Sequence, residues 1–120
     1  MNTFNLIGRV VGAPKFFTNA DKSQTAVFTL AVNRDYKNAD GSVTADFINL
    51  QGFIPADKTA NNRFTYLEKG MLISCSGSIR SYVSEKNGVK NYGMSMTVSN
   101  ISFLESKQVV ESRRTNTVNA

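Results

Sequence analysis

Apolar and polar residues alternate along most of this chain, and a period of two is typical of β-strands. The alternation is clearest from Thr25 to Asn33, where one set of alternate residues is entirely apolar. That set consists of Ala26, Phe28, Leu30 and Val32. Further strands are predicted over residues 4–11, 43–53, 71–81 and 89–104, and residues 15–18 are expected to continue the first strand after a kink.

Turn and helix signals separate the predicted strands. Asp40-Gly41 and Asn87-Gly88 are dipeptides that favour tight hairpins, and Pro55 ends the third strand. Apolar residues between Asp57 and Leu67 are spaced as on one side of a helix, which predicts a single helix between the third and fourth strands.

The order of these elements points to one fold. Three strands, one helix and two further strands follow one another in the OB-fold, a partly open five-stranded barrel. We therefore predict an all-β protein with a five-stranded OB-fold barrel over residues 1–105. The regular period is lost beyond this point, so a disordered tail is expected over residues 106–120.

The types of residue present exclude most enzyme mechanisms. The 120-residue chain has no His, so it cannot contain a Ser-His-Asp triad, a Cys-His dyad or an imidazole acid or base. A single cysteine, Cys75, rules out an internal disulfide and a thiolate cluster, and its apolar neighbours indicate a buried side chain. We expect one domain that is not an enzyme and uses no cofactor.

The net charge of +5 lies mainly in the predicted barrel. From Glu105 onward, three cations are nearly balanced by two acids, so the basic surface belongs to the folded part. Such a surface is typical of nucleic-acid binding, although solubility alone is an alternative explanation. The chain has no apolar run of membrane-spanning length and does not start like a signal peptide, which predicts a soluble, cytoplasmic protein with no membrane partner.

Aromatic and amide side chains share one face of the predicted third strand. That face carries Phe47, Asn49, Gln51 and Phe53. The opposite face carries Ile48 and Leu50, which are core residues by type. Exposed rings can stack on unpaired bases, whereas the alternative is that both rings belong to the core. Because amides suit a core poorly, we favour a base-contacting face.

Other aromatic residues lie beside cations at two predicted hairpins. They are Arg34, Tyr36 and Lys37 after the second strand, and Arg80, Tyr82, Lys86, Lys90 and Tyr92 around the last hairpin. Single-stranded nucleic acid favours this combination, because rings stack on bases while cations neutralise phosphates. A basic hairpin can equally be a solvated tip. Lys15, Phe16 and Phe17 could form a lip of the same groove, with core packing of either ring as the alternative.

Five blocks of sequence occur in a characteristic order. They are Leu6-Ile7-Gly8-Arg9, Ala26 to Arg34, Ala45 to Asn49, Tyr66 to Gly70, and Gly77 to Tyr82. Together they resemble the bacterial single-stranded DNA-binding proteins, particularly the Gram-positive type. The resemblance covers roughly residues 1–105, which is nearly all of the predicted fold.

This resemblance implies an OB-fold protein that binds single-stranded DNA without reading its sequence and protects it during replication, recombination or repair. The aromatic residues that stack on bases in the family fall on Tyr36, Phe47, Phe53 and Tyr82. A homo-oligomer is also implied, with a tetramer built from dimers as the expected form and a dimer as the smaller alternative.

Two departures from the family pattern change these expectations. Family members end in a glycine-rich linker and an acidic, phenylalanine-terminated tip that recruits replication and repair proteins, whereas this chain ends in Thr117-Val118-Asn119-Ala120. We therefore expect recruitment through that tip to be missing, which suits a bacteriophage or mobile-element origin. Residues 55–64 also form a longer segment than usual, which could alter subunit contacts.

Two other functions fit parts of the sequence. The same fold could serve as an interaction module that recruits primosome or recombinase proteins. The aspartates could instead indicate a metal-dependent nuclease, but most of them lie in predicted turns or at strand ends, where such acids usually bond to nearby backbone N–H groups.

Overall fold

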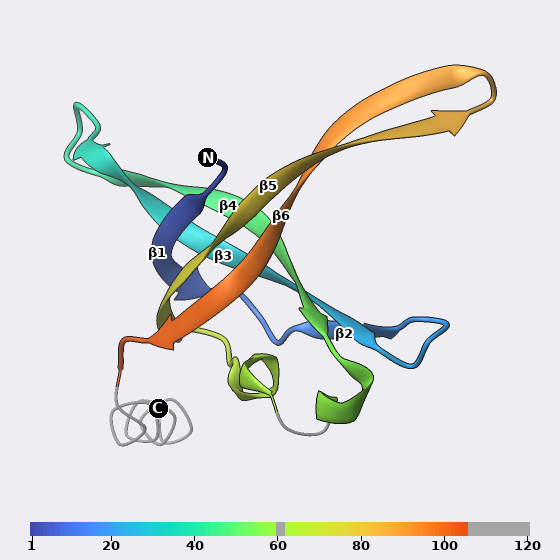
Figure 1. The fold of residues 1–120 in the computed structure, drawn as a ribbon. Helices are drawn as coiled ribbons and strands as arrows, with labels where there is room; N and C mark the ends of the chain where they lie inside the picture. The colour runs from blue at the N-terminus through green and yellow to red at the C-terminus, as the bar shows by residue number, and fades with distance from the viewer. Residues whose placement is uncertain (60–61, 106–120) are drawn as a thin grey trace.

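The structure is a computed structural model that describes residues 1–59 and 62–105. In chain order its elements are β1 (Phe4–Val10), β2 (Lys15–Thr18), β3 (Gln24–Lys37), β4 (Val43–Ile54), the 3₁₀ helices η1 (Ala56–Lys58) and η2 (Arg63–Tyr66), β5 (Leu72–Lys86) and β6 (Val89–Phe103). Figure 1 shows the strands wound around one another, with long hairpins that project from the centre. The predicted disordered tail over 106–120 lies outside the described residues.

Five of the strands close into a barrel. The strand order is β1-β5-β6-β4-β3-β2, and closure comes from β1, which pairs with β5 and also with β3. β4 and β6 pair in parallel at Gln51 and Thr97, whereas the other pairings are antiparallel. The short strand β2 lies outside the closed barrel, on the edge of β3. The predicted five-stranded OB-fold barrel is confirmed.

The core lies inside the barrel, where the alternation of the sequence placed it. Ala26 and Leu30 are fully buried and Phe28 is nearly so, whereas their neighbours on β3 are only partly buried. The ring of Phe64 packs against Phe28 at a centroid distance of 6.2 Å. It reaches that position over Gly52, where a Cβ would collide with the ring. A β-strand glycine thus leaves space for the segment that covers one end of the barrel.

The predicted helical segment between β4 and β5 is confirmed. Its helical turns are shorter than the single helix that the spacing of its apolar residues predicted. The described part contains η1 and η2 in place of one continuous helix from Asp57 to Leu67. Asn62 caps η2, because its side-chain oxygen accepts hydrogen bonds from the backbone N–H groups of Phe64 and Thr65. The Nδ2 group of Asn62 also donates to the carbonyls of Lys58 and Thr59, so one side chain joins the end of η1 to the start of η2.

Two hairpins extend beyond the barrel (Figure 1). β5 reaches Lys86, five residues past the predicted end of that strand, and turns at Asn87 and Gly88, whose φ angles are 55° and 79°. Beyond Gly77, β5 pairs only with β6 in the described residues. β3 likewise runs on to Lys37, and its pairing with β4 is irregular between Asn33 and Lys37.

The turns at the two ends of β3 share one construction. Residues 19–25 and 38–44 both read Asn-Ala-Asp-X-Ser-X-Thr. In each turn the Asn side chain donates to the Ser hydroxyl at 3.0 Å and to the final Thr hydroxyl. The Asp carboxylate accepts from the Ser backbone N–H at 3.1 and 3.0 Å, respectively. The fourth position has a positive φ, 72° at Lys22 and 87° at Gly41, so this turn fixes the register on both sides of β3.

Candidate nucleic-acid interface

The outer face of β4 carries the aromatic and amide side chains that the sequence analysis singled out. Phe47 is 68% exposed and Phe53 is 59% exposed, whereas Leu50 and Ile54 are buried. Each outward residue lies opposite a residue of β3: the pairs are Phe47 with Ala31, Asn49 with Thr29, Gln51 with Val27 and Phe53 with Thr25. Small β3 side chains therefore leave both rings free on one face.

Hydrogen bonds orient the two amides on this face. The Thr29 hydroxyl donates to Oδ1 of Asn49 at 2.8 Å. The Nε2 group of Gln51 donates to the Thr97 hydroxyl of β6 at 3.4 Å. Each amide is thus tied to a neighbouring strand through one of its two polar atoms, and the other makes no hydrogen bond to any described residue.

Residues of β2 extend the same face by two rows across the sheet. One row is Lys15, Val27 and Gln51, and the next is Phe17, Thr25 and Phe53. Phe16 instead pairs with buried Ala26, so its ring is directed to the other side of β2. The sequence left open whether these β2 residues form a lip of the groove or pack in the core. Lys15 and Phe17 lie on the lip of this face, and Phe16 does not.

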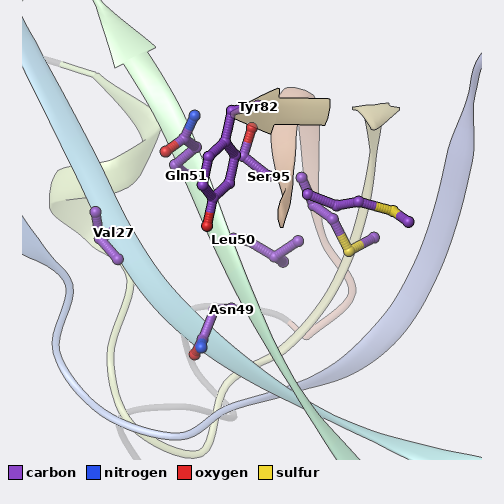
Figure 2. A pocket seen from close by; sticks show the side chains of 8 residues that line it. Val27, Asn49, Leu50, Gln51, Tyr82 and Ser95 are labelled. Carbon is purple, nitrogen blue, oxygen red and sulfur yellow. The ribbon is translucent and has the colours of Figure 1, made fainter. Parts of the chain in front are cut away.

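A groove separates this face from the base of the β5–β6 hairpin. Two adjoining hollows of about 480 and 420 Å³ share Gln51. The first is lined by Val27, Asn49, Leu50, Gln51, Tyr82, Met94, Ser95 and Met96, and the second by Thr25, Gln51, Gly52, Phe53, Arg80 and Thr97. Figure 2 shows the Tyr82 ring standing beside Gln51 and Ser95 at the edge of the first hollow. The groove therefore brings together five of the predicted residues from β4 and β5.

The β5–β6 hairpin divides its own candidates between two faces. Arg80 and Tyr82 lie opposite Ser95 and Gly93 on one face and line the groove, which Met94 and Met96 also reach from the other face. The Tyr82 ring covers Gly93, where a Cβ would overlap it. Tyr92 lies opposite Val83 and so is directed to the other face. The remaining cations, Lys86 and Lys90, are exposed near the tip.

Tyr36 lies on the opposite side of the β3–β4 hairpin from Phe47. Its ring borders a hollow of about 740 Å³ that is also lined by Val32, Asp46 and Ile48, the inward residues of the two strands. The predicted residues therefore include two groups, five residues in the groove and Arg34 with Tyr36 at this second site, whereas the others line neither. Those others are Lys37, Phe47, Lys86, Lys90 and Tyr92. The period of two accounts for the opposite sides of Tyr36 and Phe47, because Arg34 and Tyr36 follow Val32 at intervals of two, whereas Phe47 alternates with Ile48.

Arg34, in the second group, forms an ion pair. Its Nη2 group lies 3.0 Å from Oδ1 of Asp46, its Nε group bonds to the same carboxylate, and its Nη1 group bonds to the Tyr36 hydroxyl. Hydrogen bonding to Arg34 lowers the pKa of Asp46, and bonding to Asp46 raises the pKa of Arg34. Lys37 nearby makes no ion pair within the described ranges.

Several residues of the groove were missed by the sequence analysis. Val27 could have been found, because it lies on the strand face opposite the apolar set of β3. Met94 and Met96 could not, because they reach the groove through the parallel pairing of β4 with β6, between segments more than 40 residues apart.

The acidic side chains and Cys75 are the remaining candidates for metal binding or thiol chemistry. No group of three or more Cys, Asp or Glu side chains among the described residues could hold a metal ion. Burial raises the pKa of the Cys75 thiol to about 11, so this side chain stays protonated and unreactive at neutral pH. In the same ranges, no helix has the length and hydrophobicity that crossing a membrane requires.

Comparison with known families agrees with this arrangement. The pattern of the Single-strand binding protein family matches residues 1–104, which is the whole barrel. The chain belongs to the Single-strand binding protein family. Membership in the Single-strand binding protein family confirms the resemblance drawn from the five sequence blocks.

Relatives of known name support the Gram-positive likeness. The chain is 34% identical to Single-stranded DNA-binding protein 1 of Streptococcus pyogenes over 94% of this chain and 84% of that protein. It is 36% identical to Single-stranded DNA-binding protein B of Bacillus subtilis over 88% of this chain and 92% of that protein. Among solved structures, the barrel resembles a Plasmodium falciparum SSB in complex with ssDNA, with a TM-score of 0.65 and 20% identity over 88% of this chain and 96% of that one, which shows the fold.

Proposed function

We propose that this protein is a non-catalytic binder of single-stranded DNA, in which aromatic rings stack on bases and cations neutralise phosphates. The observation that carries the proposal is the groove of β4 and β5, where the exposed rings of Phe53 and Tyr82 stand beside Asn49, Gln51 and Arg80. A duplex hides the faces of its bases, so exposed rings favour an unpaired strand.

Each candidate has a distinct role in this proposal. The stacking residues are Tyr36, Phe47, Phe53 and Tyr82, and Tyr92 adds a ring on the far face of the hairpin. The phosphate contacts are Lys37, Arg80, Lys86 and Lys90, to which the position of Lys15 adds one more. Arg34 differs from these cations because it is paired with Asp46.

Binding of this kind depends little on base sequence. Every base has a face on which a ring can stack, and each stacked base is worth about 1–3 kcal/mol. If the protein neutralises Z phosphates, the logarithm of the affinity falls with the logarithm of salt concentration with a slope of about −0.7Z. Such a protein would protect single strands during replication, recombination or repair in the cytoplasm.

A free strand edge supports a homo-oligomer. β1 pairs with β5 from Phe4 to Arg9, but with β3 only at Arg9 and Val10. The first part of β1 therefore presents an unpaired edge on its β3 side, within the described part of the chain. Exposed edges readily pair with another chain. We take a tetramer to be the functional form, and light scattering on the purified protein tests it.

A titration with poly(dT) and with a duplex of equal length tests the function. We expect strong binding of the single strand and weak binding of the duplex, and equal affinity for both would contradict stacking. Phe47→Ala should weaken binding about five- to 150-fold, the factor that corresponds to one lost stack. Leu104→Ala is the matched control, because it shortens an exposed apolar side chain outside the groove.

A further inference from the structure

Arg34 has three sides of its guanidinium engaged within the protein. Nε donates to both carboxylate oxygens of Asp46 at 3.3 and 3.1 Å, and Nη2 donates to Oδ1 at 3.0 Å. Nη1 donates to the Tyr36 hydroxyl at 3.3 Å. One side chain thus joins β4 to the ring that follows it on β3.

This link bridges the place where the sheet itself is interrupted. Val32 pairs with Asp46 and Asn33 with Ala45, and regular pairing resumes only at Lys37. Backbone pairing therefore does not fix the orientation of Tyr36, which is 61% exposed. The hydrogen bonds of Arg34 supply a fixed point on the regular part of β4.

The charge of Arg34 is matched within the same contact. The carboxylate of Asp46 lies against the guanidinium, so the two groups together carry no net charge. A neutral pair releases few counterions when a phosphate approaches, whereas a free lysine releases about one. The Arg34–Asp46 pair is therefore better suited to holding the Tyr36 ring than to neutralising DNA phosphates.

We propose that Arg34 is a positioning residue, which holds the Tyr36 ring in place for stacking through its pairing with Asp46. This inference rests on the proposed function, because it assigns a role within single-stranded DNA binding. A lysine cannot take over that role, since it lacks the planar set of donors needed to hold the carboxylate and the tyrosine hydroxyl together.

The test compares dT oligonucleotide affinity over a range of salt concentrations in several variants. Arg34→Lys keeps the positive charge, and we expect it to weaken binding about two- to tenfold, the factor that one ordinary hydrogen bond is worth. In a Tyr36→Ala background the same substitution should change nothing further. The double variant Arg34→Gln with Asp46→Asn keeps the net charge and should leave the salt slope unchanged.

Lys37→Ala is the matched control, because it removes an exposed cation of the same hairpin and should reduce the magnitude of the salt slope by about 0.7. The proposal is overturned if Arg34→Lys binds as tightly as the unchanged protein, or if the Arg34→Gln and Asp46→Asn double variant reduces the slope as much as Lys37→Ala does. Failure of the proposed function looks different: the unchanged protein would then show no preference for the oligonucleotide over a duplex.

Discussion

Gly93 offers a way to move one candidate ring without touching it. A Cβ at this position would lie 2.5 Å from the Tyr82 hydroxyl oxygen and 2.9 Å from Cε1 of its ring. Carbon atoms in contact are separated by about 3.5–4.0 Å, so Gly93→Ala requires the ring to shift by about 1 Å or more. Because Tyr82 is 52% exposed, the ring can swing outward and the barrel need not change.

The expected effect is a loss of affinity without a loss of stability. If the Tyr82 ring leaves its position beside Gln51, one stack worth about 1–3 kcal/mol is lost, which lowers dT oligonucleotide affinity about five- to 150-fold. Alanine is a better strand residue than glycine, so the free energy of unfolding should stay the same or rise slightly. Fluorescence anisotropy measures the first quantity, and urea unfolding measures the second.

Gly12→Ala is the matched control, because no described residue other than its two chain neighbours has a heavy atom within 4 Å of the position its Cβ would take. It should leave affinity unchanged. In the double variant with Tyr82→Ala, the effect of Gly93→Ala should disappear, since both changes remove the same stack. The reasoning is refuted if Gly93→Ala binds as tightly as the unchanged protein, or if it weakens binding equally in the Tyr82→Ala background.

Two further predictions concern the paired turns of β3. Lys22→Gly should raise the free energy of unfolding by about 0.5–1 kcal/mol, because glycine adopts a positive φ without strain, as Gly41 does in the other turn. Gly41→Lys should lower the free energy of unfolding by a similar amount. Equal stabilities of the variants and the unchanged protein in urea would contradict this. The pKa values of Asp21 and Asp40 lie below the ordinary 3.8, chiefly because of a hydrogen bond from the serine hydroxyl two residues later. Their contribution to stability is therefore present above the ordinary pKa and is lost as pH falls through the lowered value, so Asn at both positions should reduce the acid sensitivity of unfolding measured by circular dichroism. An unchanged acid transition would show that these carboxylates do not contribute.

The alternation of apolar and polar residues predicted those parts of the fold in which one face of a strand is buried. The barrel strands and the outward face of β4 follow from it, because one face of each strand must pack in the core. The reach of β5 to Lys86 does not follow, since both faces of that hairpin are in solvent and no apolar period marks its length. The predicted helix was too long for a related reason. The spacing of apolar residues indicates which residues pack, whereas the N-cap Asn62 sets where η2 begins.

The contacts that group the candidate residues were not predicted from the sequence. Tyr36 and Phe47 are both exposed rings near one hairpin, and they lie on opposite sides because Tyr36 alternates in phase with the inward Val32, whereas Phe47 alternates out of phase with the inward Ile48. The pairing of Arg34 with Asp46 depends on the cross-strand register, in which Asp46 lies opposite Val32. Local patterns report on neighbours along a strand, whereas these contacts depend on how two strands are aligned.

The long β5–β6 hairpin gives one pair of strands two levels of local stability. Up to Ile79 and Met96 the two strands also contact β4, the core or the Asn2 side chain, but from Arg80 and Ser95 to the tip each strand has only the other as a pairing partner in the described residues. A two-stranded ribbon is marginal in water, so its amides should open and exchange with solvent without global unfolding. Bound single-stranded DNA that orders this ribbon would slow the amide exchange. The loss of conformational entropy in the ribbon would then reduce the affinity for the DNA. In the proposed binding mode, the ligand would therefore contact a rigid part of the barrel at β4 and a less rigid ribbon at Tyr82.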